Sequence, residues 1–118
     1  MSEMNVISKL KKRKEFLIVS KKGKYINCKD FVIQFYKRSN SEENTLGLVR
    51  YGITASKKVG NAVSRNRAKR RIRVIIRELL PKLAARDFDY VVVAKNSLNK
   101  ANIFDLKKEL IKTLKNIY

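Results

Sequence analysis

The sequence contains no histidine, one cysteine and one proline. The absence of histidine rules out a histidine general base and histidine metal ligands. A single cysteine, Cys28, supplies neither an internal disulfide nor a zinc site. No apolar run approaches the length that spans a membrane, and the N-terminus lacks the apolar segment of a signal peptide. We therefore expect a cytoplasmic protein that needs no membrane, with Cys28 as a small, partly buried thiol.

Acidic residues are also scarce, and positive charge is in excess. Lys and Arg number 29 against 10 Asp and Glu, which gives a formal net charge of +19 over 118 residues. Hydrophobic residues still make up 44% of the chain, so it is not composed like a disordered tail and can bury a modest core. The length predicts one domain covering residues 1–118. The charge predicts a polyanionic partner, a nucleic acid before a membrane surface.

The basic residues concentrate between Ser56 and Arg77. Nine Lys and Arg lie in this stretch, and no acidic residue occurs from Asn44 to Arg77. Like charges repel one another and oppose compactness. A short charged run is usually only a solvated helix face. This run is long, unpaired by acids and rich in arginine, whose planar group binds phosphate through two donors and stacks on bases. We interpret it as a surface for a polyanion.

As a helix that starts near Asn61, this stretch has two faces. An apolar stripe predicts docking on a core, and it consists of Ala68, Ile72, Ile75, Ile76, Leu79, Leu80 and Leu83. The opposite side is basic and has Asn66 at its edge; its arginines are Arg67, Arg70, Arg71, Arg73 and Arg77. Arg65 and Lys69 lie on the apolar side, at the end where long side chains can extend past the core.

The residues ahead of this helix predict a loop that enters it. Gly60 permits close backbone approach, and Asn61 can cap the helix. The free N–H groups and positive dipole of a helix N-terminus favour anions. A second basic segment, residues 9–24, is either a lysine-rich solvated helix or a further element that faces RNA.

The motif is a Ser-Lys-Lys loop, then Gly-Asn-Ala-Val, then an Arg-Asn-Arg core with further basic residues after it. The residues that form it are Lys57, Lys58, Val59, Gly60, Asn61, Ala62, Val63, Arg65, Asn66, Arg67, Lys69, Arg70 and Arg73. This pattern resembles the signature of the bacterial ribonuclease P protein family. Length, charge and element order fit as well, so the resemblance covers nearly the whole chain.

The remaining pattern predicts an α+β fold, a small two-layer sandwich with the order α-β-β-α-β-α. An extra short strand before residue 30 is compatible with this order. The expected elements are a helix ending near Gly23, strands at 31–36 and 46–55, the basic helix, a strand at 88–95, and a last helix capped by Asn102. The valine run of the third strand predicts burial on both faces.

Three finer expectations concern how these elements connect. Strands 31–36 and 46–55 are expected to form an antiparallel hairpin, joined by a loop at 39–45 that holds two acidic residues and faces away from RNA. The basic helix is expected to end near Leu80, because Pro81 disfavours helix in the residue before it. A strand–helix–strand crossover is usually right-handed, whereas the resemblance implies a left-handed one.

The resemblance also implies a role. Proteins of this family assist a catalytic RNA that uses Mg²⁺ to remove the 5′ leader of precursor tRNA. We therefore expect Mg²⁺ to be held mainly by RNA, and the partners to be ribonuclease P RNA and precursor tRNA, with no protein partner required. The residues expected to bind RNA are Lys57, Lys58, Asn61, Arg65, Asn66, Arg67, Lys69, Arg70, Arg71 and Arg73.

A cleft for the single-stranded leader is also implied, and it is expected to contain Phe16, Tyr36, Asn66 and Lys69. Ser20 and Gln34 stand where relatives commonly carry aromatic residues, which predicts a weaker leader contact or one displaced to Tyr36. An equally good alternative makes Phe16 a core residue that anchors the first helix.

The acidic residues give little support for catalysis by the protein itself. Hydrolases of phosphodiesters usually hold Mg²⁺ on clustered carboxylates, and the closest spaced pair beside a strand is Asp87 and Asp89. This pair fits a polar turn better than a metal site. No His/Lys or Ser/His arrangement exists for acid–base chemistry. The sequence favours an RNA-binding subunit with no catalytic residue and no metal site of its own.

Composition alone leaves three alternatives. A ribosomal protein has a similar size, charge and mixed fold, and only the motif argues against it. A DNA-binding protein needs a helix with base-reading side chains, whereas this helix carries mostly arginines of the phosphate-binding type. A stand-alone nuclease is disfavoured by the missing histidine and the unclustered carboxylates.

Overall fold

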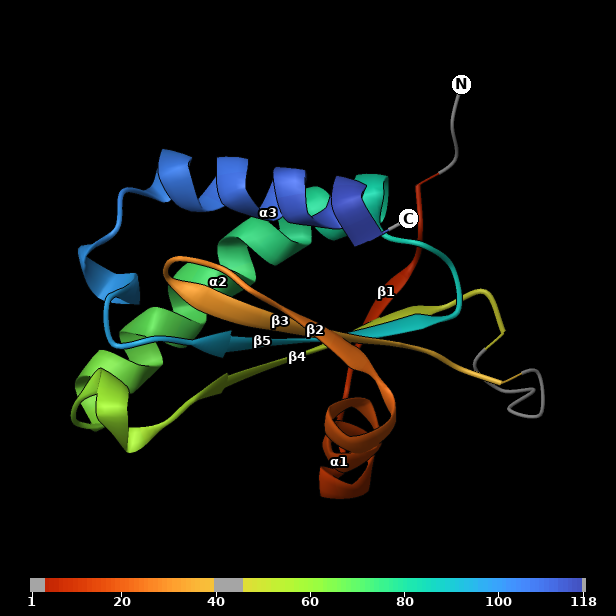
Figure 1. Cartoon of the computed structure of the whole chain (residues 1–118), viewed down its shortest axis with the longest axis horizontal. Helices are drawn as coiled ribbons and strands as arrows, with labels where there is room; N and C mark the ends of the chain where they lie inside the picture. The colour runs from red at the N-terminus through yellow and green to blue at the C-terminus, as the bar shows by residue number, and fades with distance from the viewer. Residues whose placement is uncertain (1–3, 40–45, 118) are drawn as a thin grey trace.

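The computed structural model describes residues 4–39 and 46–117, so most of the loop expected at 39–45 lies outside the described residues. Figure 1 shows the elements in chain order: β1 (Ile7–Lys9), α1 (Arg13–Lys22), β2 (Lys24–Asn27), β3 (Phe31–Lys37), β4 (Val49–Ala55), the 3₁₀ turn η2 (Lys57–Val59), α2 (Ala62–Leu83), β5 (Phe88–Ala94), the 3₁₀ turn η3 (Leu98–Lys100) and α3 (Ile103–Ile117). The α+β prediction is confirmed, and β2 is the extra strand before residue 30. Strand β1, with only three residues, was not predicted.

The five strands form one sheet in the order β1-β4-β5-β3-β2. Strand β3 pairs antiparallel with β2 and β5, while β4 pairs parallel with β1 and β5. The predicted hairpin of β3 and β4 is wrong because β5 lies between them. The valine-rich β5 is buried on both faces, and a central position in the sheet satisfies that burial and the hydrogen bonds of both its edges.

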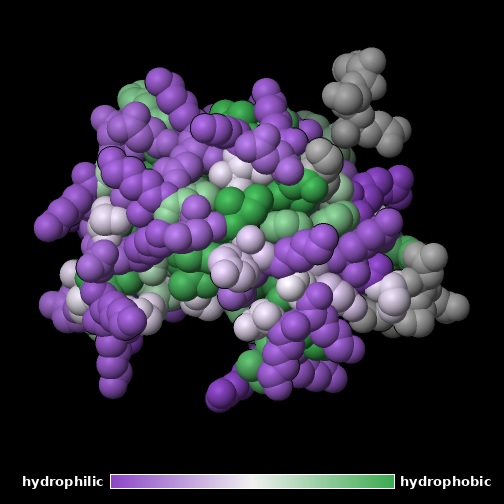
Figure 2. Space-filling view, in the orientation of Figure 1, coloured by the Kyte–Doolittle hydropathy of each residue, from purple (hydrophilic) through white to green (hydrophobic). Residues whose placement is uncertain are grey.

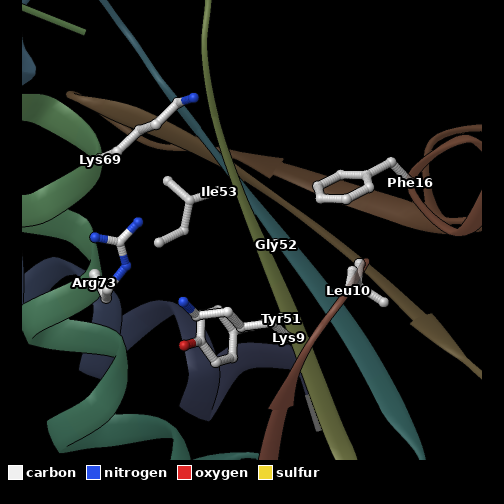
Figure 3. Close-up of a pocket in the computed structure, with 8 residues that line it drawn as sticks. All are labelled: Lys9, Leu10, Phe16, Tyr51, Gly52, Ile53, Lys69 and Arg73. Atoms are coloured by element: carbon white, nitrogen blue, oxygen red, sulfur yellow. The ribbon is translucent and has the colours of Figure 1, made fainter. Parts of the chain in front are cut away.

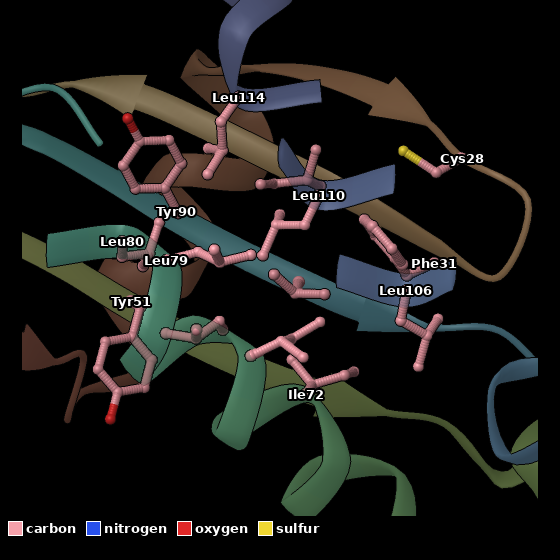
Figure 4. Packing of buried hydrophobic residues seen from close by; sticks show 14 of the residues in the cluster. Cys28, Phe31, Tyr51, Ile72, Leu79, Leu80, Tyr90, Leu106, Leu110 and Leu114 are labelled. Atoms are coloured by element: carbon pink, nitrogen blue, oxygen red, sulfur yellow. The ribbon is translucent and has the colours of Figure 1, made fainter. Parts of the chain in front are cut away.

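Helices α2 and α3 cover one face of the sheet, and α1 packs on the other (Figure 1). The main core lies between the sheet and α2 and α3, as Figure 4 shows for Phe31, Ile72, Tyr90 and Leu110. Cys28 is buried at the edge of this core, and burial raises the pKa of its thiol. A smaller cluster under α1 contains Leu10, Val19, Val91, Phe16, Tyr36 and Val93.

Helix α2 passes through Pro81 and ends at Leu83, so the predicted end near Leu80 is wrong. Proline lacks an N–H and loses one helical hydrogen bond, but here the N-terminal segment binds the carbonyl groups that follow. The backbone N–H of Asn5 donates to Pro81 O at 2.7 Å, and Asn5 Nδ2 donates to Ala84 O at 2.5 Å. These bonds satisfy carbonyl groups at the helix end and allow one more turn.

Helix α1 ends at Lys22 and Gly23 caps it, close to the predicted end, although Gly23 is not in the left-handed conformation. A Cβ atom at this position would overlap the carbonyl oxygens of Val19 and Phe35. Glycine is therefore required because the chain passes close to β3. At the other end of the molecule, Asn102 Oδ1 accepts the N–H of Phe104 at 2.8 Å, which confirms the predicted cap of α3. Within the described residues, no helix has the length and apolar character needed to cross a membrane.

Candidate nucleic-acid interface

The segment that enters α2 is a tight turn followed by a capped helix. Gly60 has a φ of +136°, a value that favours glycine. Asn61 Oδ1 accepts the backbone N–H of Ser64 at 2.9 Å, which confirms the predicted cap. In η2, Ser56 Oγ accepts the N–H of Lys58 at 3.3 Å. This geometry leaves Lys57 and Lys58 exposed ahead of the helix N-terminus, where the dipole also favours an anion.

Helix α2 has the two predicted faces, but Arg71 and Arg73, which were predicted on the outward basic face, are half-buried. The apolar stripe is buried except for Leu83, which is half-buried. Asn66, Arg67, Arg70 and Arg77 are exposed, and Arg65, Lys69 and Arg73 are half-buried. Among the described residues, no ion pair involves a basic residue of Ser56–Arg77. Figure 2 shows hydrophilic side chains projecting at the end of the molecule where α2 begins. This surface carries positive charge that no described acidic residue neutralises through an ion pair.

Arg71 differs from its neighbours on α2. Its Nη1 donates to Leu98 O at 2.6 Å, and its Nη2 donates to Ala101 O. Its guanidinium therefore holds the turn η3 and the start of α3 against α2. Asn99 adds a second tie, because its Nδ2 donates to Ser64 O at 2.9 Å. Contact of Arg71 with RNA stays a prediction, but this side chain is already occupied within the fold.

A cavity of about 170 Å³ opens between α1, β4 and α2 (Figure 3). Its lining consists of Lys9, Leu10, Phe16, Tyr51, Gly52, Ile53, Lys69 and Arg73. Strand β1 ends at Lys9 opposite Tyr51, so no described strand lies beside the outer edge of β4 from Gly52 onward. Three cationic side chains and two aromatic rings, those of Phe16 and Tyr51, thus meet at an open strand edge, and no carboxylate of the described residues belongs to the lining.

Phe16 contributes both to packing and to the cavity. Its ring lies against the backbone of β4, where a Cβ atom on Gly52 would overlap the ring carbon Cε1. The side chain is half-buried and packs on the small cluster under α1. Its remaining surface lines the cavity. The two predicted roles of Phe16, core anchor and cleft residue, are therefore compatible in this geometry.

The four residues predicted for the leader cleft do not all meet. Phe16 and Lys69 line the same cavity. Asn66 is exposed on α2 outside its lining, and Tyr36 packs on the cluster under α1 and lines a separate hollow with Phe35 and Phe88. A leader contact by Tyr36 or Asn66 stays a prediction.

Two cationic residues of the cavity were not assigned to it from the sequence. Arg73 lies one helical turn after Lys69, so the spacing could have indicated it. Lys9 belongs to the three-residue strand β1, which is too short for its periodicity to be recognised.

The carboxylates Asp87 and Asp89 serve the fold. Asp89 is 2% exposed and forms ion pairs with Arg38 at 2.6 Å and with Arg50 at 2.7 Å. Asp87 has a φ of 68°, and its Oδ1 accepts the N–H of Gly47 at 2.6 Å. Across residues 4–39 and 46–117, no three His, Cys, Asp or Glu side chains form a group that could hold a metal ion. Asp87 lies in a polar turn, as predicted, whereas Asp89 lies in β5, where its burial is compensated by the two arginines.

Comparison with known proteins assigns this arrangement to a family. The family model described as Ribonuclease P matches residues 4–118. The Ribonuclease P protein component of Streptococcus agalactiae serotype III is 36% identical over 107 residues, which cover 91% of this chain and 91% of that protein. The component of Bacillus pumilus is 39% identical over 103 residues, which cover 87% and 82%. The chain belongs to the ribonuclease P protein family.

Solved structures of ribonuclease P proteins share the fold described above. The RNase P protein from Thermotoga maritima aligns with a TM-score of 0.77 and 28% identity, over 94% of this chain and 98% of that one. The Staphylococcus aureus protein aligns with a TM-score of 0.74 and 28% identity, over 92% and 94%. Family membership confirms the resemblance seen in the motif and replaces the ribosomal and DNA-binding alternatives. It implies a role in tRNA 5′ processing, in partnership with an RNA subunit.

Proposed function

We propose that this chain is the protein subunit of the ribonuclease P ribonucleoprotein and binds both the catalytic RNA and the 5′ leader of precursor tRNA. One observation carries the proposal: a long basic face on α2, which forms no ion pair among the described residues up to Arg77, lies beside a cavity that combines aromatic rings with cations. The face suits a folded RNA, which presents mainly phosphates. The cavity suits a single strand, whose bases are free to stack.

The catalytic RNA is assigned to the exposed face of α2 and to η2. Arg67 and Arg70 project from the helix, and Lys57 and Lys58 precede its N-terminus. Arginine can contact two phosphate oxygens at once, and the exposed amide groups of a helix start add further donors. These groups recognise the RNA backbone and its shape rather than its base sequence.

The leader is assigned to the cavity of Figure 3. A base stacked on the free surface of Phe16 would place its phosphates near Lys9, Lys69 and Arg73, which line the same space. Stacking on an aromatic side chain is worth about 1–3 kcal/mol per base, and it is tolerant of sequence. Such tolerance suits a protein that meets leaders of many sequences.

The chemistry is assigned to the RNA subunit, together with Mg²⁺. The carboxylates of the described residues do not fit a magnesium site, because Asp89 is already bound by Arg38 and Arg50. The protein then acts in the cytoplasm by holding substrate and by reducing repulsion between the phosphates of two RNA molecules. Reconstitution tests this division of labour. Precursor tRNA should be cut at the mature 5′ end only when the RNA subunit is present, at any Mg²⁺ concentration; specific cleavage by RNA-free protein would overturn the assignment.

Replacement of Phe16 by alanine tests the leader site directly. In the reconstituted holoenzyme, the variant should bind precursor tRNA with a long leader about 1–3 kcal/mol more weakly, the usual worth of one stacked base. Binding of mature tRNA should be nearly unchanged, because it has no leader. Precursors with long, one-nucleotide and absent leaders are compared, together with the melting temperature. Tyr36→Ala is the matched aromatic control from outside the cavity.

Equal losses of affinity for all three substrates, with a large drop in melting temperature, would make Phe16 a core residue only. Leader-dependent loss in Tyr36→Ala as well would extend the leader contact to the far end of β3.

A further inference from the structure

Helix α1 is tied to the sheet by a chain of charged groups that the proposed function does not use. Arg50 on β4 donates from Nε and Nη2 to the two carboxylate oxygens of Asp89, at 2.8 and 2.7 Å. Its remaining terminal nitrogen, Nη1, donates to Glu15 Oε2 at 2.7 Å. One guanidinium therefore joins a buried carboxylate of β5 to a carboxylate in the first turn of α1.

Glu15 in turn fixes the start of α1. Its Oε1 accepts the backbone N–H groups of Lys11 and Lys12, at 2.9 and 2.8 Å. Burial alone would raise the pKa of Glu15, but these two amides and the charges of Arg50 and Lys12 lower it below its ordinary value. The ionised carboxylate is thus favoured, and it links the helix N-terminus to Arg50.

The residue after Glu15 is Phe16, whose ring lies against Gly52. Arg50 and Gly52 are two residues apart on β4, so they face the same side of the sheet. The first turn of α1 consequently docks on β4 at two adjacent points, one charged and one aromatic. Gly52 supports the ring but has no side chain to fix its position. Val19 packs α1 on Leu10 and Val91 further along the helix, so the charged contact is the one that fixes the first turn of α1, next to the ring.

We propose that Arg50 is a positioning residue for leader recognition: by holding Glu15, it keeps the Phe16 ring seated on Gly52 and exposed to the cavity. The effect on RNA rests on the proposed function, in which Phe16 touches the leader. The effect on the ring is a property of the free protein and does not depend on RNA.

The contacts of Arg50 with Glu15 and Asp89 can be removed without leaving either carboxylate without a partner. In Arg50→Gln, Asp89 keeps its ion pair with Arg38 at 2.6 Å. Glu15 keeps the two amide groups of the α1 N-terminus. Glu15→Gln breaks the same link from its more exposed end and leaves the pair of Arg50 and Asp89 intact, so it serves as a second variant if Arg50→Gln folds poorly.

The first measurement uses free protein and nuclear magnetic resonance. The Phe16 ring lies over Gly52, so ring current shifts the Hα resonances of this glycine, and Phe16→Ala gives their position without the ring. In Arg50→Gln and Glu15→Gln, these resonances should move toward the Phe16→Ala position. Lys107→Gln is the matched control, because it breaks the ion pair with Glu78 between α2 and α3. Unmoved Gly52 resonances in both Arg50→Gln and Glu15→Gln would overturn the proposal.

The second measurement is a double-mutant cycle on holoenzyme affinity for precursor tRNA with a long leader and for mature tRNA. Arg50→Gln should lower the affinity for precursor by up to the loss seen in Phe16→Ala, which is about five- to 150-fold, the equivalent of one stacked base. The double variant should lose no more than Phe16→Ala alone. Affinity for mature tRNA should not change.

Additive losses, or an equal loss for mature tRNA, would show that Arg50 acts elsewhere and would overturn the proposal. A different failure would be a shifted Gly52 resonance together with unchanged affinity for precursor tRNA in both Arg50→Gln and Phe16→Ala. This result would overturn the leader assignment, and with it the effect of Arg50 on RNA. The two failures are therefore distinguishable.

Discussion

Arginines on the two faces of the sheet are used in opposite ways. On the α1 face, Arg38 and Arg50 are matched by buried or half-buried carboxylates, with Asp89 shared between them. On α2, Arg67 and Arg70 are exposed and no described carboxylate pairs with them. The same type of side chain is therefore a part of the fold on one face and, at Arg67 and Arg70, a charge without a described partner on the other. Acceptor groups of the protein, either carboxylates as for Arg50 or backbone carbonyls as for Arg71, distinguish a structural arginine from one that is free to bind an external anion.

The difference between the paired arginines of the α1 face and the unpaired arginines of α2 can be tested most strongly by varying the salt concentration. If the unpaired charges of α2 neutralise roughly six to ten phosphates, affinity for the catalytic RNA should fall by about 10³–10⁵ between 50 and 200 mM salt, by analogy with counterion release from duplexes. Filter binding across this range measures the slope. The melting temperature of the free protein should not fall over this range, because buried pairs are screened less and salt relieves the repulsion among the exposed basic residues. A flat binding response would rule out phosphate contacts as the main contribution.

The ion pairs that Arg38 and Arg50 form with Asp89 can be removed together by substitution of Asp89. Asp89→Ala removes the shorter ion pair of the buried Arg38 and leaves it the longer one with Asp87 at 3.7 Å. Loss of one partner of a buried pair costs about 3–5 kcal/mol. The melting temperature should therefore fall steeply, as measured by circular dichroism. Below the transition, affinity for the catalytic RNA should stay near that of the unaltered protein. Retention of the original melting temperature would mean that Arg38 and Arg50 do not depend on Asp89.

Two arginines of α2, four residues apart in sequence, allow an exposed arginine to be compared with a structural one on the same helix. Arg67→Ala removes an exposed charge, so it should reduce the salt slope of RNA binding by about one and leave the fold intact. Arg71→Ala should instead lower the melting temperature, because Arg71 holds the carbonyl groups of Leu98 and Ala101. Binding and circular dichroism are measured for both. Loss of structure in Arg67→Ala would mean that the outward face has been assigned wrongly.

The smallest expected effect is a pH dependence of the pair formed by Glu15 and Arg50. The pKa of Glu15 is lowered from 4.5 in the folded protein. Its contribution to stability is therefore present above pH 4.5 and is lost as the pH falls through the folded pKa. The difference in melting temperature between the protein and Glu15→Gln should shrink over that interval, from an initial difference worth about 1 kcal/mol or less. A difference that stays constant with pH would exclude the ionised carboxylate as its source.

Elements with strong local periodicity were predictable from the sequence. The apolar stripe of α2, its cap at Asn61 and the buried strand β5 all follow from residue spacing. The choice of partner for β3 was not predictable in this way, because any antiparallel or parallel neighbour satisfies its pattern of alternation. Only the burial requirement of β5 places that strand between β3 and β4.

The candidate site was predictable to a similar degree. The basic face could be predicted because its residues are close in sequence. The cavity could not, because it brings together Lys9, Phe16 and Lys69 from three separate elements. The ion pairs of Arg50 could not be predicted from the sequence either, because Asp89 lies 39 residues away and Glu15 lies 35 residues away. Contacts of this kind are set by tertiary packing, and no local pattern records them.

The short strand β1 and the bonds of Asn5 have a consequence for how the chain is made. Synthesis proceeds from the N-terminus, and Asn5 is joined to Ala84, which is 79 residues further on. Strand β1 likewise has its partner in β4. The segment that holds Asn5 and β1 therefore docks only after the chain has been made as far as Ala84. Until β4 has been made, α1 has no strand to rest on, and the cavity, whose walls come from β1, α1, β4 and α2, cannot form before α2 has been made.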